Sequence, residues 1–235
     1  MNREYHRWYS QHLGHDMELL LFGHGGTPYI VFPSSMGSFH EYEDTGMVGA
    51  LGEKLHHGAL QLFCVTSADR ESWYNRAAPP RHRIDRALAY EGYLLNDVVP
   101  LVRQRNSNGI GVTGCSFGAY QALTFALRRP EVVSSSVVMS GAFEIHQFLD
   151  GYYDQDCYFF SPTHFLPGLT DSWFLDRFRA IKWVLATGEH DICLRDNERM
   201  SDLLTAKGIP HSLHVWQGMW HDWPWWQKMA QAYLP

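Results

Sequence analysis

The sequence has 235 residues, a length that suits one domain with a single large core. Hydrophobic residues make up 45% and charged residues 19%, which is typical of a globular protein rather than a disordered or fibrous one. The formal charge of −6 comes without a basic stripe, so nucleic acid is not an expected partner. No run approaches the ~18 consecutive apolar residues of a membrane span, so a membrane is excluded too.

The start of the chain and the cysteines predict the compartment. Residues 1–16 mix charges and histidines without an apolar run, which argues against a signal peptide. The four cysteines, at positions 64, 115, 157 and 193, are scattered and form no CxxC pair. Reduced thiols in a cytoplasmic protein are therefore expected.

The first third of the chain alternates apolar segments with turn signals. The pattern predicts strands at 5–13, 16–22, 28–32 and 59–66, and a helix at 46–58. His24-Gly25-Gly26 resembles the oxyanion motif of some lipases, but here it precedes a strand instead of following one. We therefore interpret it as a hairpin turn between the second and third strands.

The middle of the chain contains a long helix and a sharp strand–turn–helix. The helix is predicted from Arg81 to Arg105, with an interruption at Pro100. The segment Gly109–Pro130 then places Gly-Cys-Ser-Phe-Gly, centred on Ser116, between an apolar strand and an alanine-rich helix. This context is typical of a nucleophile elbow, in which the serine backbone is strained and its hydroxyl stands free at the top of a sheet.

The last part of the chain returns to alternating strands and helices after one irregular segment. Strands are predicted at 132–140, 181–187 and 211–216, and helices at 194–207 and 223–233. Residues 143–178 are rich in aromatic residues, aspartate and proline, and we interpret them as a cap or lid over the sheet; a solvated connection is the alternative. The sequence thus predicts one α/β domain over 1–235, with a mostly parallel sheet covered on both faces and antiparallel strands at its start.

A serine nucleophile needs a general base, and position selects His221 among the 14 histidines. His221 follows the last predicted strand and precedes the last helix, whereas His211 and His214 belong to the strand itself. The acid is expected after the preceding strand, where Asp191 is our choice and Glu189 the fallback. Asp222 is a poor candidate, since it cannot easily reach back to the ring of its predecessor.

The negatively charged oxygen of a tetrahedral intermediate needs two hydrogen-bond donors. One is the backbone N–H of Phe117, and the other is expected from Ser34 or Ser35 in the loop after the third strand. No HExxH, GxxxxGK[ST] or GxGxxG motif is present, and His56 and His57 are adjacent on a helix. We therefore expect no metal and no cofactor.

Four segments resemble the α/β-hydrolase superfamily, in particular its esterase D, antigen 85 and polyhydroxyalkanoate-depolymerase-like branch. They are VFPSSMGSFHEYED, GCSFGAYQA, GEHDICLRDNERMSDLLTAKGIPH and HVWQGMWHDWPWW. Within that branch, the chain is similar to a group of short, cytoplasmic bacterial esterases. The resemblance implies the catalytic set Ser116, Asp191 and His221, a loop donor near Ser34 and Ser35, and no cofactor.

The sequence therefore predicts a serine carboxylic-ester hydrolase that acts through an acyl-enzyme on a small-molecule ester. The aromatic insertion and the tryptophan-rich C-terminal region favour an apolar acyl pocket, and the short insertion favours short acyl chains. An acyltransferase that uses the same acyl-enzyme is the alternative, which the antigen 85 likeness also implies. A non-catalytic scaffold is a third hypothesis, and a homodimer is left open.

Overall fold

The structure is a computed structural model, and it describes residues 2–235. Within this range eight strands form one sheet in the order β1-β2-β4-β3-β5-β6-β7-β8. The strands are β1 (Arg3–Ser10), β2 (His15–Phe22), β3 (Thr27–Phe32), β4 (Leu60–Val65), β5 (Ile110–Cys115), β6 (Val133–Met139), β7 (Lys182–Gly188) and β8 (His211–Trp216). The β1–β2 and β2–β4 pairs are antiparallel and all the others are parallel, as predicted.

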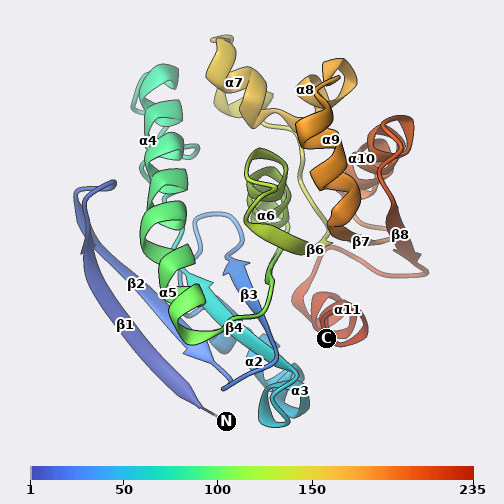
Figure 1. The fold of residues 1–235 in the computed structure, drawn as a ribbon. Helices are drawn as coiled ribbons and strands as arrows, with labels where there is room; N and C mark the ends of the chain where they lie inside the picture. Colours follow the sequence, from blue (N-terminus) through green and yellow to red (C-terminus); the bar gives the residue numbers. More distant parts are fainter. Residues whose placement is uncertain (1) are drawn as a thin grey trace.

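Helices cover both faces of this sheet (Figure 1). One face carries α1 (Glu41–Asp44), α2 (Met47–Ala50), α3 (Gly52–His56) and α11 (Trp223–Tyr233). The other carries α4 (Pro80–Tyr93), the π-helical η1 (Leu94–Val98), α5 (Val99–Arg105), α6 (Phe117–Arg128), α9 (Ser172–Ala180) and α10 (Leu194–Ala206). Every residue of the central strands β4 and β5 is buried, because each strand has helices on both sides.

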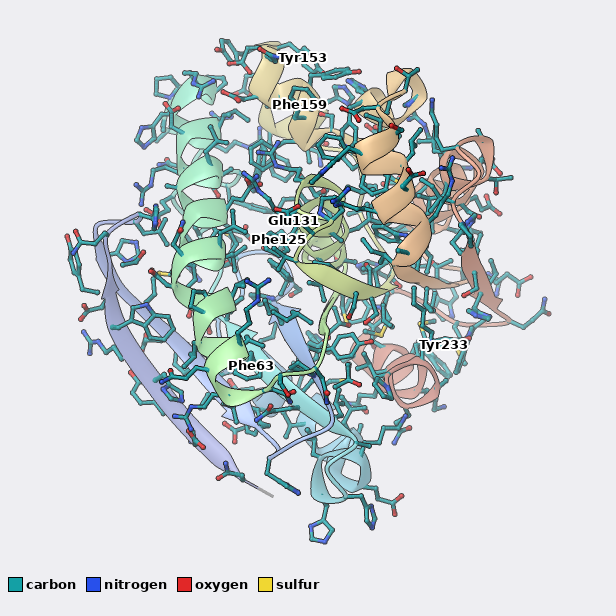
Figure 2. All side chains as sticks on the ribbon, in the orientation of Figure 1. Phe63, Phe125, Glu131, Tyr153, Phe159 and Tyr233 are labelled. Carbon is teal, nitrogen blue, oxygen red and sulfur yellow. The ribbon has the colours of Figure 1, made fainter. Side chains whose placement is uncertain are left out.

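The side chains fill the two spaces between helices and sheet, where Phe63 of β4 and Phe125 of α6 lie in the same core (Figure 2). This architecture of one sheet between two layers of helices is the predicted fold class. No helix within residues 2–235 is both long enough and apolar enough to cross a bilayer.

The hairpin predicted at Gly23–Gly26 is wrong. The turn exists, but β4 lies between β2 and β3 and pairs with both of them. Gly26 has a φ of 80°, and a Cβ there would lie 2.1 Å from the Ala59 carbonyl. The turn therefore packs against the start of β4, which places β3 beyond that strand.

The helix predicted over 46–58 is divided into the two short helices α2 and α3, with α1 before them. Glycine weakens a continuous helix, and this stretch contains Gly46 in the left-handed region at φ 77°, followed by Gly49 and Gly52. The interruption predicted at Pro100 is present. The wider π-turn of η1 comes immediately before α5, where the proline ring would otherwise crowd the carbonyl four residues earlier.

Residues 143–178 contain the 3₁₀ turn η2 (His146–Phe148), α7 (Gln155–Phe160), α8 (Pro162–Gly168) and most of α9. Phe148 and Phe165 are buried in the core, whereas Tyr153 and Phe159 are exposed, with Tyr153 at the upper edge of the molecule in Figure 2. The Phe148 ring packs 5.3 Å from the ring of Phe117, the residue after Ser116. This segment therefore packs beside the elbow, and its closing over the site as a lid stays a prediction.

Candidate active site

Ser116 lies at the tight junction between β5 and α6, with φ 56° and ψ −121°. A positive φ is strained for a residue other than glycine, and such strain persists only where the surroundings hold it. The Ser116 N–H donates to the Met139 carbonyl at 2.9 Å, and the Ser116 carbonyl accepts from the N–H groups of Ala119 and Ala142. The backbone is therefore held from β6 and α6, and the side chain is left partly accessible.

The two glycines that flank Ser116 at a distance of two residues are required by packing. A Cβ at Gly114 would lie 2.4 Å from the Gly118 carbonyl carbon. A Cβ at Gly118 would lie 2.4 Å from the Phe32 oxygen and 2.5 Å from the Pro33 oxygen. The Gly-x-Ser-x-Gly pattern thus allows the end of β3, the end of β5 and the start of α6 to meet.

His221 faces Ser116 from the loop between β8 and α11. The Ser116 Oγ and the His221 Nε2 are 2.9 Å apart, and the hydroxyl donates when that nitrogen is unprotonated. The imidazole lies nearly perpendicular to the ring of Trp226 in α11, with centroids 4.8 Å apart and planes at 86°. Only 19% of the His221 side chain is exposed, so packing restricts the ring to this orientation.

Asp191 completes the chain of hydrogen bonds from the loop after β7. Its Oδ1 accepts from the His221 Nδ1–H at 2.8 Å and from the Cys193 N–H at 2.7 Å, and its Oδ2 accepts from the Ser140 hydroxyl. Burial of this fully enclosed carboxyl raises its pKa, but the three donors outweigh burial and leave the pKa of Asp191 below its ordinary value. Asp191 is therefore an anion at neutral pH, suited to orient a protonated His221 Nδ1.

Sequence reasoning missed Ser140, which supports Asp191 from the end of β6. Its hydroxyl donates to Asp191 and accepts from the Trp226 Nε1–H at 2.8 Å, and its backbone is at φ 53°. Trp226 thus contacts both the His221 ring and the serine that holds Asp191. No local motif marks Ser140; only its place at the end of a strand beside the elbow strand could have indicated it.

The other candidates for the acid and the base have separate partners. The Glu189 carboxylate accepts from the Gly218 N–H at 3.0 Å, and the Asp222 carboxylate caps α11 at the Trp223 N–H. His211 bonds to the Ser201 hydroxyl, and His214 stacks on Tyr233. None of them is placed to replace Asp191 or His221.

The loop after β3 distinguishes Ser34 from Ser35. The N–H and the hydroxyl of Ser34 both donate to Glu41, at 2.7 and 2.6 Å, so neither donor of Ser34 is free to bind an oxyanion in this structure. The Ser35 Oγ accepts from the Tyr74 hydroxyl at 2.6 Å, which leaves its own proton free. Within residues 2–235 the backbone N–H groups of Ser35 and Phe117 have no acceptor.

Cys115, beside the nucleophile candidate, faces away from the site. It is fully buried, its nearest polar partner is the Tyr42 hydroxyl at 3.8 Å, and burial raises the pKa of its thiol. All four cysteines are buried and unpaired. Cys115 therefore fills space under the elbow rather than competing with Ser116.

Three side chains elsewhere have a spacing that could hold a metal ion: Glu144, His146 and His164. Their ligand atoms lie within 4.8 Å of one another. However, Glu144 also accepts from the guanidinium of Arg199 at 2.6 Å, a cation that opposes binding of a second one. Asp191 and His221 belong to a second such group with Cys193, where their oxygen and nitrogen atoms already bond to each other.

Comparison with known proteins supplies the family. The sequence model of the Esterase family, described as "Putative esterase", matches residues 28–162, which is more than half of the chain. No curated protein sequence matches it. Among solved structures, a ferulic acid esterase superposes with a TM-score of 0.79 at 14% identity, over 100% of this chain and 96% of the other.

Two S-formylglutathione hydrolases have the same fold. The enzyme from Agrobacterium tumefaciens gives a TM-score of 0.74 at 15% identity, over 99% of this chain and 92% of its own. FrmB from Staphylococcus aureus gives 0.72 at 16% identity, over 99% and 95%. At these identities the structures show a common α/β-hydrolase fold, and the sequence match decides membership: this chain belongs to the Esterase family.

Proposed function

We propose that the protein hydrolyses carboxylic esters through an acyl-enzyme, with Ser116 as nucleophile, His221 as general base and Asp191 as the acid that orients it. The observation that carries this proposal is the unbroken chain of hydrogen bonds from Ser116 to His221 to Asp191 at a positive-φ elbow. A serine hydroxyl is a weak nucleophile unless a base takes its proton, and this arrangement supplies the base.

The first half of the reaction acylates Ser116. The Oγ attacks the ester carbonyl carbon while the His221 Nε2 takes the hydroxyl proton, and the Asp191 anion stabilises the resulting imidazolium. The tetrahedral intermediate then expels the alcohol, which receives the proton from Nε2. In the second half, Nε2 takes a proton from water, the hydroxide attacks the acyl carbon, and Ser116 leaves with the proton returned to it.

The oxyanion of both intermediates rests on the start of α6 and the loop after β3. The supporting observation is that the Phe117 and Ser35 N–H groups have no acceptor of their own, which buried or half-buried amides rarely lack. The Tyr74 ring packs on the Phe117 ring while its hydroxyl bonds to the Ser35 Oγ, so Tyr74 contacts both of the residues whose N–H groups we propose as donors.

We base the proposed substrate class on the aromatic residues next to Ser116 and on the similar solved structures. Phe117, Tyr74 and Phe148 form an aromatic cluster next to the nucleophile, with ring centroids 4.8 to 5.5 Å apart. Such a cluster favours small or short-acyl esters over a long lipid chain. The relatives named for ferulic acid and S-formylglutathione differ in both acyl group and leaving group, so the proposal stays at the level of the class. Four buried, unpaired thiols support a reducing compartment, the cytoplasm.

The test is intact-mass spectrometry after treatment with a fluorophosphonate, on the wild type and on Ser116→Ala, together with hydrolysis of short p-nitrophenyl esters. We expect one adduct and turnover in the wild type, and neither in the variant. Glu189→Gln is the matched control, because it changes a nearby carboxylate outside the hydrogen-bonded chain. An added competing alcohol then separates hydrolysis from acyl transfer by the product formed. Turnover that survives in Ser116→Ala would overturn the proposal.

A further inference from the structure

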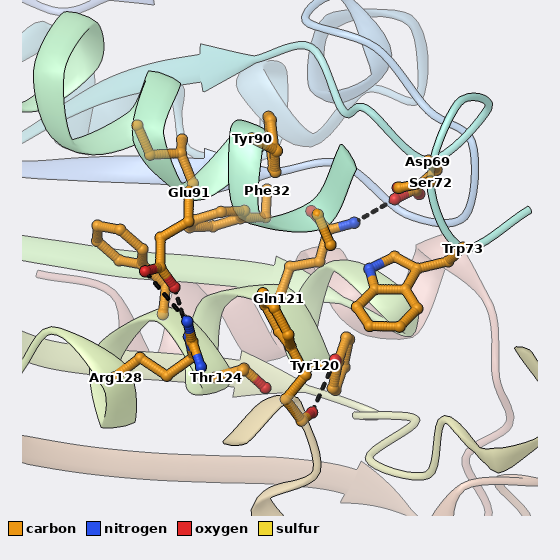
Figure 3. Close-up of a pocket in the computed structure, with 14 residues that line it drawn as sticks. Phe32, Asp69, Ser72, Trp73, Tyr90, Glu91, Tyr120, Gln121, Thr124 and Arg128 are labelled. Atoms are coloured by element: carbon orange, nitrogen blue, oxygen red, sulfur yellow. Dashed lines mark hydrogen bonds and ion pairs between the residues drawn. The ribbon is translucent and has the colours of Figure 1, made fainter. Parts of the chain in front are cut away.

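Asp69 is a buried carboxyl group that the proposed reaction does not use. It lies in the loop after β4, and only 1% of it is exposed. Its Oδ1 accepts from the Gln121 Nε2–H at 2.6 Å, and its Oδ2 accepts from the Met36 N–H at 2.9 Å (Figure 3 shows the bond to Gln121). Burying a carboxyl group is costly unless its oxygens are paired, so both contacts are part of what keeps Asp69 in place.

The Met36 contact is one of three that hold the loop after β3 against the loop after β4. The Ser67 hydroxyl donates to the Gly37 carbonyl at 2.9 Å, and the Tyr74 hydroxyl donates to the Ser35 Oγ at 2.6 Å. Met36 itself has φ 56°, a conformation that is unfavourable for residues other than glycine. The shape of the loop at Ser35 is therefore imposed by its neighbours rather than preferred by its own residues.

The Gln121 contact reaches the other side of the proposed oxyanion site. Gln121 lies in the second turn of α6, the helix that starts at Phe117. Asp69 thus joins, through two hydrogen bonds, the loop that carries the Ser35 N–H and the helix that carries the Phe117 N–H. Within residues 2–235, no other carboxylate side chain accepts hydrogen bonds from both of these elements.

We propose that Asp69 is a positioning residue that sets the distance between the Ser35 and Phe117 donors. This inference rests on the proposed function. Asp69 touches no reacting atom; it acts through Met36 and Gln121 on the two groups that would bind the oxyanion. Because these donors contribute mainly in the transition state, losing Asp69 lowers kcat and leaves KM nearly unchanged.

The structure also indicates which substitution should restore function. The Gln121 Oε1 is buried without a partner, so its amide can turn over and accept from an asparagine Nδ2 at position 69. The asparagine Oδ1 would still accept from the Met36 N–H. Asp69→Asn therefore keeps both connections, whereas Asp69→Ala loses both.

The experiment compares Asp69→Ala and Asp69→Asn with the wild type and with Ser72→Ala. Ser72 is a matched control, since it is buried in the same loop but bonds only within it, to the Ala68 carbonyl. Each protein is measured for kcat and KM on a short p-nitrophenyl ester, for inhibition by a trifluoromethyl ketone that forms a tetrahedral adduct, for inhibition by the product acid, and for thermal unfolding.

We expect Asp69→Ala to lower kcat by roughly 10- to 100-fold. This decrease should not exceed the one that removal of an oxyanion donor causes. The ketone should bind more weakly by a similar factor, and KM and product inhibition should change less than about threefold. Asp69→Asn should return kcat to within about threefold of the wild type, and Ser72→Ala should keep it there. If Asp69→Ala does not fold, Gln121→Met removes the link to α6 alone and should show the same pattern more weakly.

Two outcomes would overturn this inference alone, and a third would overturn the proposed function. A folded Asp69→Ala with wild-type kcat and ketone affinity, in a protein whose Ser116 is labelled by fluorophosphonate, would overturn only the role of Asp69. Equal losses in Asp69→Ala and Ser72→Ala would also overturn it, because they would indicate a general effect on the loop. Failure of the proposed function would appear instead as turnover that persists in Ser116→Ala.

Discussion

Adding a single methyl group at Gly118 tests the elbow directly. In Gly118→Ala the new Cβ would start 2.4 Å from the Phe32 oxygen and 2.5 Å from the Pro33 oxygen. Side-chain Cβ atoms essentially never approach closer than 3.0 Å, so the gap must widen by at least 0.6 Å. Both clashing atoms are backbone atoms at the end of β3, and neither can rotate away. The start of α6 must therefore move relative to the loop that carries Ser35.

This displacement should lower both the stability of the protein and the rate of the reaction. Overpacking a well-packed interior costs about 1–3 kcal/mol, which lowers the melting temperature of a domain of this size by roughly 2–12 °C. A misplacement that approaches 1 Å at a reacting centre costs up to about 100-fold in rate. Since Ser116 and Phe117 are the two residues before Gly118, we expect kcat/KM for a short ester to fall by about 10- to 100-fold.

The assay is steady-state hydrolysis of a p-nitrophenyl ester together with thermal unfolding, and Gly49→Ala is the control. Gly49 lies in α2, where an added Cβ meets nothing within 4 Å. That variant should keep full activity and gain up to about 1 kcal/mol from the better helix propensity of alanine. Equal activity and stability in Gly118→Ala and Gly49→Ala would refute the packing argument for the elbow.

Three further outcomes follow from the hydrogen-bond chain and the buried acids. Asp191→Asn should lower kcat by about 10⁴-fold, while Glu189→Gln stays within about twofold; the reverse pattern in ester assays would reassign the acid. Ser140→Ala leaves the Trp226 Nε1–H and one Asp191 oxygen unpaired, so urea unfolding should show a loss of about 1–3 kcal/mol, and no loss would contradict this. Burial raises the pKa of Asp69 to about 7, above its ordinary value, so the native state holds an extra proton between about pH 4 and 7. The stability of the wild type relative to Asp69→Asn should therefore fall as pH rises through that range, by at most about 1.4 kcal/mol per pH unit; parallel unfolding curves would exclude this.

The sequence predicted the strands and helices well where the period of apolar residues was long and uninterrupted. The strand before Ser116, the alanine-rich helix after it and the parallel sheet all have local signatures. The order of the strands in the sheet has no such local signature. Nothing between Phe22 and Thr27 indicates that β4 will insert between β2 and β3, because that position depends on a strand about 30 residues later. The predicted hairpin failed for this reason.

The candidate site, too, could be predicted in part from the sequence. Ser116, Asp191 and His221 could be selected because each follows a predicted strand, and the carboxyl ends of parallel strands meet at one edge of a sheet. Their hydrogen-bonding distances are what the structure adds. The sequence could not show that Ser34 and Ser35 differ, since the difference depends on Glu41, whose carboxylate accepts from both donors of Ser34.

Trp226, in the tryptophan-rich C-terminal region, has a role that composition alone could not indicate. It is only 4% exposed, and it contacts both His221 and the serine that supports Asp191. Its ring packs nearly perpendicular to the His221 ring, and its Nε1–H donates to Ser140, which in turn donates to Asp191. Asp222, the residue after His221, caps α11 and so fixes the helix that carries Trp226. The orientation of His221 therefore depends on the helix that follows it.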